Sequence, residues 1–131
     1  MTTDTPARSP LADESYVSLE TFRKDGSGVK TPVWAAPLDG TLVVFCAGDS
    51  YKVKRLRNDP RCRVAGCDVR GKVHGEWRDG TGRVIDDAAH VTRILAALRA
   101  KYGLLFAVTD FFSALTGKKK KRAYLELTLT A

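Results

Sequence analysis

Hydrophobic and polar residues alternate with a period of two over much of the chain, which is the pattern of half-buried β-strands. The segment SYVSLETFRK is the first example, because Val17, Leu19 and Thr21 face one side and the residues between them face the other. The DGSG residues that follow are typical of a turn. We therefore predict a strand that begins near Ser15.

The next two strands are predicted by a hairpin signal. The Asp39-Gly40 pair stands between the runs VKTPVWAAPL and TLVVFCA, and this dipeptide between apolar runs favours a tight β-turn. Pro32, inside the first run, has no N–H group to donate to a strand ladder. We therefore expect Pro32 at a sheet edge, at a bulge or at a gap in the pairing.

Three further runs complete the β pattern. RCRVAGCDVRG and GEWRDGTGRVIDD are punctuated by glycines, and AYLELTLT alternates strictly. The apolar face of this last run carries Ala123, Leu125, Leu127 and Leu129. Several short strands with turn residues between them predict a small, largely antiparallel β-barrel.

A helical period appears late in the chain, between Asp87 and Gly103. The apolar residues at helical spacing there are Val91, Ile94, Leu95, Leu98 and Tyr102, and glycine follows as a C-terminal cap. A second apolar stripe is formed by Leu105, Val108, Phe112 and Leu115. We expect this stripe to pack in the core or at a subunit interface. Peripheral membrane contact, helped by the cationic run from Lys118 to Arg122, is the less favoured alternative.

The composition is that of one domain. The 131 residues, 44% of them hydrophobic, are enough for one small core. Residues 1–14 are polar and rich in turn formers, so we predict a flexible arm there and a single domain over residues 15–131. The formal net charge of +7 suits a phosphorylated or polycarboxylate small molecule, nucleic acid or an anionic membrane. Because the aromatic residues are not interleaved with the Lys and Arg runs, we expect no nucleic-acid partner.

The cysteines and the apolar runs indicate the cellular compartment in which we expect the protein. Cys46, Cys62 and Cys67 have neither C-x-x-C spacing nor a nearby histidine pair, so neither a disulfide framework nor a metal site is indicated. The N-terminal residues lack the apolar segment of a secretory signal, and no apolar run approaches the roughly 20 residues that span a bilayer. We expect a cytoplasmic protein with reduced thiols.

The basic segment GDSYKVKRLRNDP contains a candidate anion site. If Ser50 caps a short helix, the unpaired N–H groups of the first turn can hold a phosphate. The helix must then turn its apolar residues toward the barrel, namely Val53 and Leu56. In that orientation Lys52 lies beside the first turn, whereas Lys54 and Arg55 point outward. No G-x-G-x-x-G or P-loop fingerprint precedes the segment.

Two motifs in this order resemble a known family: T-P-V-W and, one hairpin later, K-x-K-R-L-R-N-D-P-R. Residues 15–103 and the last strand resemble the flavin and deazaflavin reductases of the split β-barrel group that includes pyridoxamine phosphate oxidase. Within that group the chain most resembles the actinobacterial branch that depends on coenzyme F420. The resemblance implies a mainly β (α+β) fold, a split antiparallel β-barrel of six to seven strands with short helices, of the FMN-binding split-barrel type.

The resemblance also implies a site. Members of the group are homodimers with two cofactor sites at the subunit interface, where one strand lies against the tricyclic ring and a helix start meets the phosphate. The residues that the resemblance and the basic segment assign to cofactor binding are Thr31, Pro32, Val33, Trp34, Cys46, Ala47, Ser50, Lys52 and Arg55. Tyr51 stands where relatives often carry glycine or another small residue, which leaves the shape of the phosphate turn open.

The implied activity is hydride transfer from reduced deazaflavin to a small organic acceptor that lies over the ring. The cofactor carries this chemistry, so no catalytic side chain is expected. Trp77 and His74 are candidates for the substrate pocket, and His90 is expected at the surface. An FMN-dependent oxidoreductase and a non-catalytic deazaflavin-binding protein remain alternatives.

Overall fold

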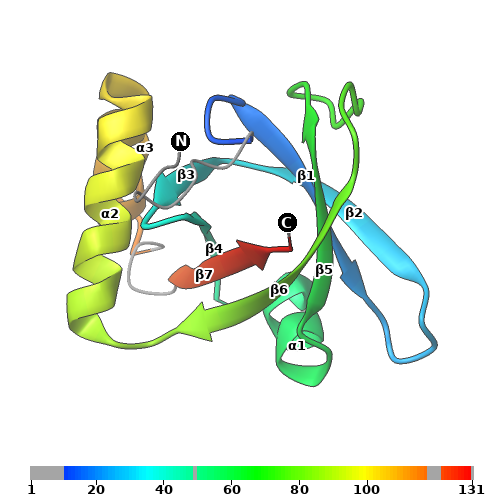
Figure 1. The fold of residues 1–131 in the computed structure, drawn as a ribbon. Coiled ribbons are helices and arrows are strands. Elements are labelled where there is room, and N and C mark those ends of the chain that lie inside the picture. The colour runs from blue at the N-terminus through cyan, green and yellow to red at the C-terminus, as the bar shows by residue number, and fades with distance from the viewer. Residues whose placement is uncertain (1–10, 49, 118–121, 131) are drawn as a thin grey trace.

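The protein is described by a computed structural model over residues 11–48, 50–117 and 122–130. In these residues seven strands form one sheet of order β2-β1-β5-β6-β7-β4-β3, and all neighbouring pairs are antiparallel. The strands are β1 (Tyr16–Phe22), β2 (Gly28–Val33), β3 (Ala35–Leu38), β4 (Thr41–Ala47), β5 (Arg61–Cys67), β6 (Arg78–Ile85) and β7 (Arg122–Leu129). The sheet curls into a half-barrel (Figure 1), which confirms the predicted mainly β, split antiparallel barrel.

The run VKTPVWAAPL forms two strands, not the single strand that the sequence predicts. It divides at Trp34, so that β2 ends at Val33 and β3 begins at Ala35. These two strands are the opposite edges of the sheet. Pro32 faces Ser18 of β1 in the edge strand β2, so the expectation of an edge position is confirmed. The two edges of the half-barrel are therefore joined at Trp34 by the continuous chain and not by hydrogen bonds between strands.

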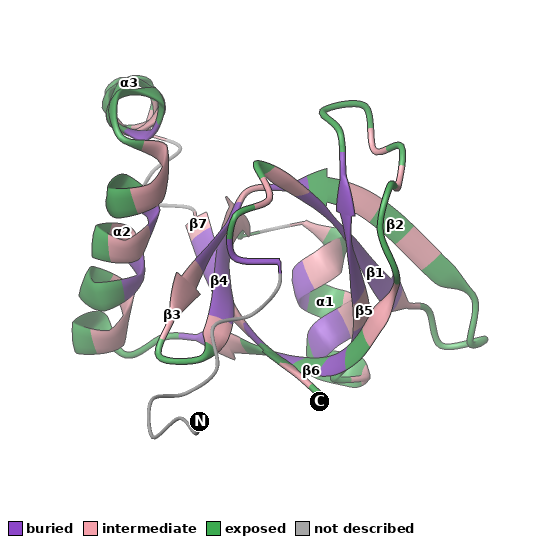
Figure 2. Cartoon of the chain, turned by 45° about the horizontal axis from the view of Figure 1, so that its top comes forward, coloured by how far each residue is buried: buried purple, intermediate pink, exposed green. Residues whose placement is uncertain are grey.

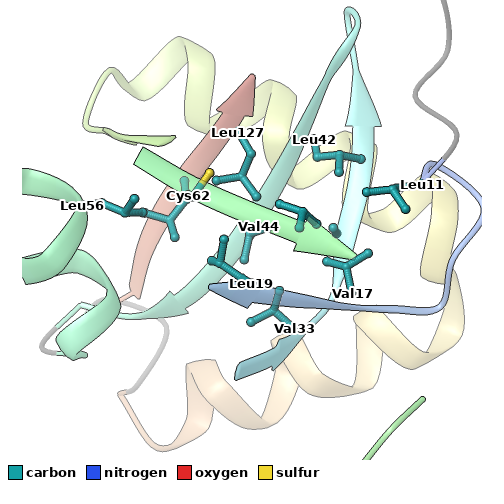
Figure 3. Close-up of a cluster of buried hydrophobic side chains, with 12 residues drawn as sticks. Leu11, Val17, Leu19, Val33, Leu42, Val44, Leu56, Cys62 and Leu127 are labelled. Atoms are coloured by element: carbon teal, nitrogen blue, oxygen red, sulfur yellow. The ribbon is translucent and has the colours of Figure 1, made fainter. Parts of the chain in front are cut away.

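The concave side of the sheet holds one hydrophobic core (Figure 3). Its buried residues are Leu11, Val17, Leu19, Val33, Ala35, Leu42, Val44, Leu56, Cys62, Val64, Leu125 and Leu127. The alternating faces predicted for the first and last strands are thus confirmed. Leu11 and Ala12 are buried, so packing begins before Ser15, within the stretch predicted as a flexible arm. The rest of that arm, residues 1–10, lies outside the described residues.

In the described part of the chain three helices flank the sheet: α1 (Tyr51–Asn58), α2 (Ala88–Tyr102) and α3 (Leu104–Leu115). Asp87 caps the start of α2, because its side chain accepts a hydrogen bond from the N–H of His90, and Gly103 caps the end as predicted. Figure 1 shows α2 and α3 together on one side of the sheet and α1 on another. A second core fills the space under α2 and α3, formed by Ala36, Val43, Ile85, Ile94, Leu98, Phe106 and Tyr124.

Much of helix α3 is exposed (Figure 2). Phe106 is its one buried residue. Six large apolar side chains of this helix are 46% to 78% exposed: Leu104, Leu105, Val108, Phe111, Phe112 and Leu115. The predicted core packing of this stripe is therefore wrong, and packing against a second subunit stays a prediction. No helix in the described part of the chain is long and apolar enough to cross a membrane.

Candidate functional site

A cleft of about 420 Å³ opens at the end of β4, and residues of β1, β2, α1 and α3 also line it. Its lining residues are Tyr16, Pro32, Val33, Trp34, Phe45, Cys46, Ala47, Lys52 and Thr109. Six of these belong to the nine residues that the sequence assigns to cofactor binding. The division of the chain at Trp34 brings both edges of the sheet to this one place.

One end of the cleft is aromatic. Trp34 stacks on Tyr102, with ring centroids 4.6 Å apart and the planes inclined by 10°, and it meets Phe45 edge-on at 6.2 Å. The Tyr102 hydroxyl donates to the carbonyl oxygen of Ser15 at 2.9 Å and accepts from the N–H of Ala35 at 3.0 Å. Burial raises the pKa of Tyr102 to about 12. The Trp34 indole is thus held by stacking on a ring whose own position is set by backbone hydrogen bonds.

The other end of the cleft is basic and adjoins the start of α1. Ser50 stands at the N-cap position, but its side chain makes no capping bond. Its hydroxyl instead lies 3.6 Å from the Cys46 sulfur. Burial raises the pKa of the Cys46 thiol, and the hydrogen bond from Ser50 and the charge of Lys52 act in the opposite direction. The predicted side-chain cap at Ser50 is therefore absent, which leaves the first-turn N–H groups of α1 without this hydroxyl as a partner.

The orientation of α1 agrees with its predicted phase, with one exception. Val53 and Leu56 are buried and Lys52 lines the cleft, whereas Lys54 lies outside it, 5.1 Å from the centre of the Tyr51 ring. Arg55, predicted to point outward, turns toward the sheet. Its Nε donates to the Thr21 hydroxyl at 2.7 Å, and burial lowers its pKa. Arg55 does not line the cleft, because the buried Thr21 hydroxyl binds it on the side of β1.

The two residues predicted for the substrate pocket lie away from this cleft. Trp77 packs under Lys30 and Arg63, whose charged groups lie 5.2 Å and 4.9 Å from its ring centre. His74 lies in the loop after β5, where Nε2 is 2.8 Å from a carboxylate oxygen of Glu14. Thr31 is half-buried in β2 and does not line the cleft either.

His90 differs from its predicted surface position. Its Nε2 lies 3.0 Å from Glu126 Oε2, in the half-buried space between α2 and β7. The other oxygen of Glu126 accepts from the Arg83 guanidinium at 2.7 Å and 2.9 Å. The histidine therefore lies beside a carboxylate of β7, and its Nε2 makes no well-aligned hydrogen bond among the described residues.

Sequence reasoning missed three residues of the cleft: Tyr16, Phe45 and Thr109. Tyr16 and Phe45 have the pattern of ordinary strand residues. Thr109 is one of the few polar residues in an otherwise apolar helix, and that polarity is the signal that could have placed it on the inward side.

A larger hollow, of about 520 Å³, lies between α2, β3 and the residues before β1. Two of its polar side chains are already engaged, because Lys101 Nζ donates to the carbonyl oxygens of Glu14 and Ala35, and the Tyr102 hydroxyl is bonded as described above. At this hollow, hydrogen bonds hold the start of the described chain against the sheet. Among the described residues no group of histidine, cysteine and carboxylate side chains could hold a metal ion.

Comparison with known proteins gives a family and a fold. The family model described as pyridoxamine 5'-phosphate oxidase matches residues 4–131. No curated protein sequence matches the chain. A conserved hypothetical protein of Mycobacterium tuberculosis has a similar structure, with a TM-score of 0.69 and 17% identity over 100% of this chain and 86% of that one.

Two further solved structures are similar. One is a Listeria innocua protein described as a candidate pyridoxamine 5'-phosphate oxidase, with a TM-score of 0.64 and 14% identity over 92% of this chain and 88% of that one. The other is an F420 reductase, with a TM-score of 0.57 and 16% identity over 100% of this chain and 97% of that one. At these identities the structures share the fold.

Proposed function

The chain belongs to the pyridoxamine 5'-phosphate oxidase family, and we propose that it is an oxidoreductase. It would bind reduced coenzyme F420 and use it to reduce an organic acceptor. The observation that carries the proposal is the composition of the cleft. It joins an aromatic wall at Trp34 and Phe45 to a cation, Lys52, at the start of α1. A molecule that consists of a planar ring and a phosphate needs both ends.

The residues present fit such a molecule. Lys52 and the first-turn N–H groups of α1 would hold the phosphate, because the Ser50 hydroxyl is turned toward Cys46 and does not occupy those groups. Val33, Trp34 and Ala47 would flank the ring. The bound cofactor supplies the hydride. The protein would position the ring and a planar acceptor, such as an activated alkene or a conjugated heterocycle, and exclude water from them.

Three observations favour deazaflavin over FMN. The sequence resembles the coenzyme F420 branch, and the fold is similar to that of an F420 reductase. The net charge of +7 also suits the polyanionic glutamyl tail of this cofactor in addition to its phosphate. FMN is the second candidate, since the family as a whole is typified by pyridoxamine 5'-phosphate oxidase and the same phosphate site would serve it.

The test is a pair of equilibrium titrations of the full chain, with coenzyme F420 and with FMN, followed by ligand absorbance or fluorescence. We expect tighter binding of the deazaflavin. FMN that copurifies at full occupancy, with no deazaflavin binding, would contradict the assignment of coenzyme F420 as the cofactor. Absence of binding by either molecule would contradict the proposed cleft function as a whole.

Turnover separates an enzyme from a cofactor carrier. The protein with reduced deazaflavin is mixed anaerobically with a panel of activated alkenes and conjugated heterocycles, and reoxidation of the ring is followed by absorbance. An enzyme accelerates reoxidation in proportion to its concentration. Tight binding without acceleration for any acceptor would identify a carrier.

We also propose that the protein acts as a homodimer. The support is the exposed apolar stripe of α3, which no described residue covers. Thr109 of the same helix lines the cleft, so a second subunit on this helix would adjoin the proposed cofactor site.

A further inference from the structure

Arg122, the first residue of β7, has a guanidinium buried between the sheet and α3. Its side chain is only 4% exposed. Nη1 donates to Asp110 Oδ1 at 2.9 Å, whereas Nη2 is buried and has no hydrogen-bond partner among the described residues. A buried donor without a partner destabilises the protein, so its presence at this position needs a reason.

The group around Arg122 carries surplus positive charge. Asp110 also pairs with Arg99 of α2, at 3.5 Å, so two guanidinium groups share this carboxylate. The Arg122 guanidinium lies 4.7 Å from the centre of the Phe45 ring and 5.9 Å from that of Phe106. These rings keep water away, and the field of a cation in such a place is screened less than that of an exposed one.

This charge lies directly behind the wall of the cleft. The register of β4 and β7 places Arg122 opposite Ala47, which lines the cleft together with Phe45. On the other side, Asp110 follows Thr109, which lines the cleft from α3. The buried arginine therefore contacts two elements that form the ring end of the site.

We propose that the positive charge of Arg122 favours the anionic form of the ring that binds in the cleft. Arg122 would thereby determine which protonation state of the ring the cleft prefers. The inference rests on the proposed function, since it requires a ring in the cleft. Both candidate rings have an anionic form near neutral pH. Oxidised 8-hydroxydeazaflavin loses a proton from its ring hydroxyl, and reduced FMN loses one from a ring nitrogen.

The described residues include six other titratable or charged groups at the cleft and its walls. They are Tyr16, Cys46, Lys52, Arg99, Tyr102 and Asp110. Lys52 lies at the phosphate end, and the two tyrosines and the cysteine carry no charge in their protonated forms. A charge effect on the ring is therefore tested best at Arg122 and Asp110.

The experiment measures the pH at which the bound ring loses half of its proton, by visible absorbance of the full chain saturated with 8-hydroxydeazaflavin. If FMN is the ring that binds, its reduced form is titrated anaerobically. Arg122→Gln retains a planar donor but removes the charge, so we expect the midpoint to rise by roughly 0.5–1 pH unit. Arg122→Lys retains the charge and should leave the midpoint within about 0.3 unit of the wild type.

Two further variants separate charge from packing. Asp110→Asn removes the negative partner and should lower the midpoint, the opposite direction from Arg122→Gln. This variant also serves if Arg122→Gln does not fold. Arg99→Gln removes a cation that shares Asp110 but is 54% exposed, and its shift should be less than about a third of that of Arg122→Gln.

The outcomes are distinguishable. Equal midpoints in the wild type and Arg122→Gln, or the same shift in Arg122→Gln and Arg122→Lys, would overturn the inference while the proposed function stands. Failure of both rings to bind the wild type would overturn the proposed function and this inference with it.

Discussion

Trp34 and Tyr102 are stacked, with ring centroids 4.6 Å apart and planes inclined by 10°. Trp34 joins β2 to β3, and Tyr102 is the last residue of α2. The stack therefore fixes the point where the two sheet edges meet against a helix that is distant in the sequence. An indole held in this way presents a rigid surface to a ligand ring.

This geometry predicts which tryptophan reports binding. A ring bound in the cleft should quench the fluorescence of Trp34, because Trp34 lines the cleft, whereas Trp77 is packed under Lys30 and Arg63. Trp34→Phe should therefore lose most of the quenching, and Trp77→Phe should retain it. The measurement is a titration of each variant with cofactor, excited at the tryptophan band. Quenching that disappears in Trp77→Phe instead would place the ligand elsewhere.

Lys52 and Lys54 form a matched pair for the phosphate. Lys52→Ala removes a charge-assisted contact and should weaken cofactor binding by roughly 1.5–3 kcal/mol, which is at least tenfold in affinity. Lys54→Ala removes a cation that lies outside the cleft, on the Tyr51 ring, and should cost only a few tenths of a kcal/mol. Titrations at fixed ionic strength measure both, with thermal melts as a control for folding. A larger loss in Lys54→Ala would show that the cleft is not the phosphate site.

Gly80 allows a close approach of β6 to β7. A Cβ atom at this position would lie 2.6 Å from the carbonyl oxygen of Thr128. Gly80→Ala should therefore force the backbone apart and lower the free energy of unfolding by roughly 1–3 kcal/mol. Gly75→Ala is the control, because a Cβ atom there would meet nothing closer than 3.9 Å. Urea denaturation of both variants measures the difference, and equal stabilities would contradict the close approach.

Tyr102 predicts how stability depends on alkaline pH. Its pKa in the folded protein is about 12, above the value of about 10 for an exposed tyrosine. The unfolded chain therefore loses this proton first, and the stabilisation by the neutral hydroxyl is complete below pH 10 and is lost as the pH rises toward 12. Tyr102→Phe lacks this ionisation. The difference in free energy of unfolding between the wild type and Tyr102→Phe should decrease from pH 9 to pH 11 in urea titrations, and a constant difference would contradict the raised pKa.

The apolar stripe of α3 predicts self-association. Replacing Leu105 and Phe112 together by glutamine should weaken it at least about tenfold, because large apolar side chains supply most of the free energy of such interfaces. Val69→Gln is the control, since Val69 is 61% exposed in a loop outside α3. Sedimentation velocity over a range of concentrations measures both variants. A wild type that is monomeric at micromolar concentration would contradict the dimer.

The period of the apolar residues and the residue types in the turns were enough to predict most strands and helices, and the structure shows why. Alternating residues of β1 and β7 face one core, and Asp39 adopts a positive φ of 50° in the predicted hairpin turn. The division at Trp34 was not predictable in this way, because β-forming residues continue on both sides of it and no turn residue marks the change. Only the pairing with distant strands reveals that the chain changes edges there.

The site was predictable to a different extent. The helical phase of α1 was sufficient to separate Lys52 from Lys54, because both apolar residues of that helix point to the core. Arg55 turns toward Thr21, and the inward face of α3 carries Phe106 in the core and Asp110 in an ion pair with Arg122. Both are contacts between distinct elements, which a local pattern does not encode. The apolar stripe of α3 has the right period, but the face that turns inward is the one with Phe106 and Asp110.

The position of β7 constrains the order in which the sheet can form during synthesis on the ribosome. This strand follows every other strand along the chain, yet it lies inside the sheet, between β6 and β4. While a ribosome is still adding residues before Arg122, the four strands β2, β1, β5 and β6 can pair, but the β3–β4 hairpin has nothing to join. Both β6 and β4 then expose open edges, which are the surfaces through which nascent chains aggregate. We expect chains stalled before residue 122 to be protease-sensitive on the ribosome and full-length chains to be resistant.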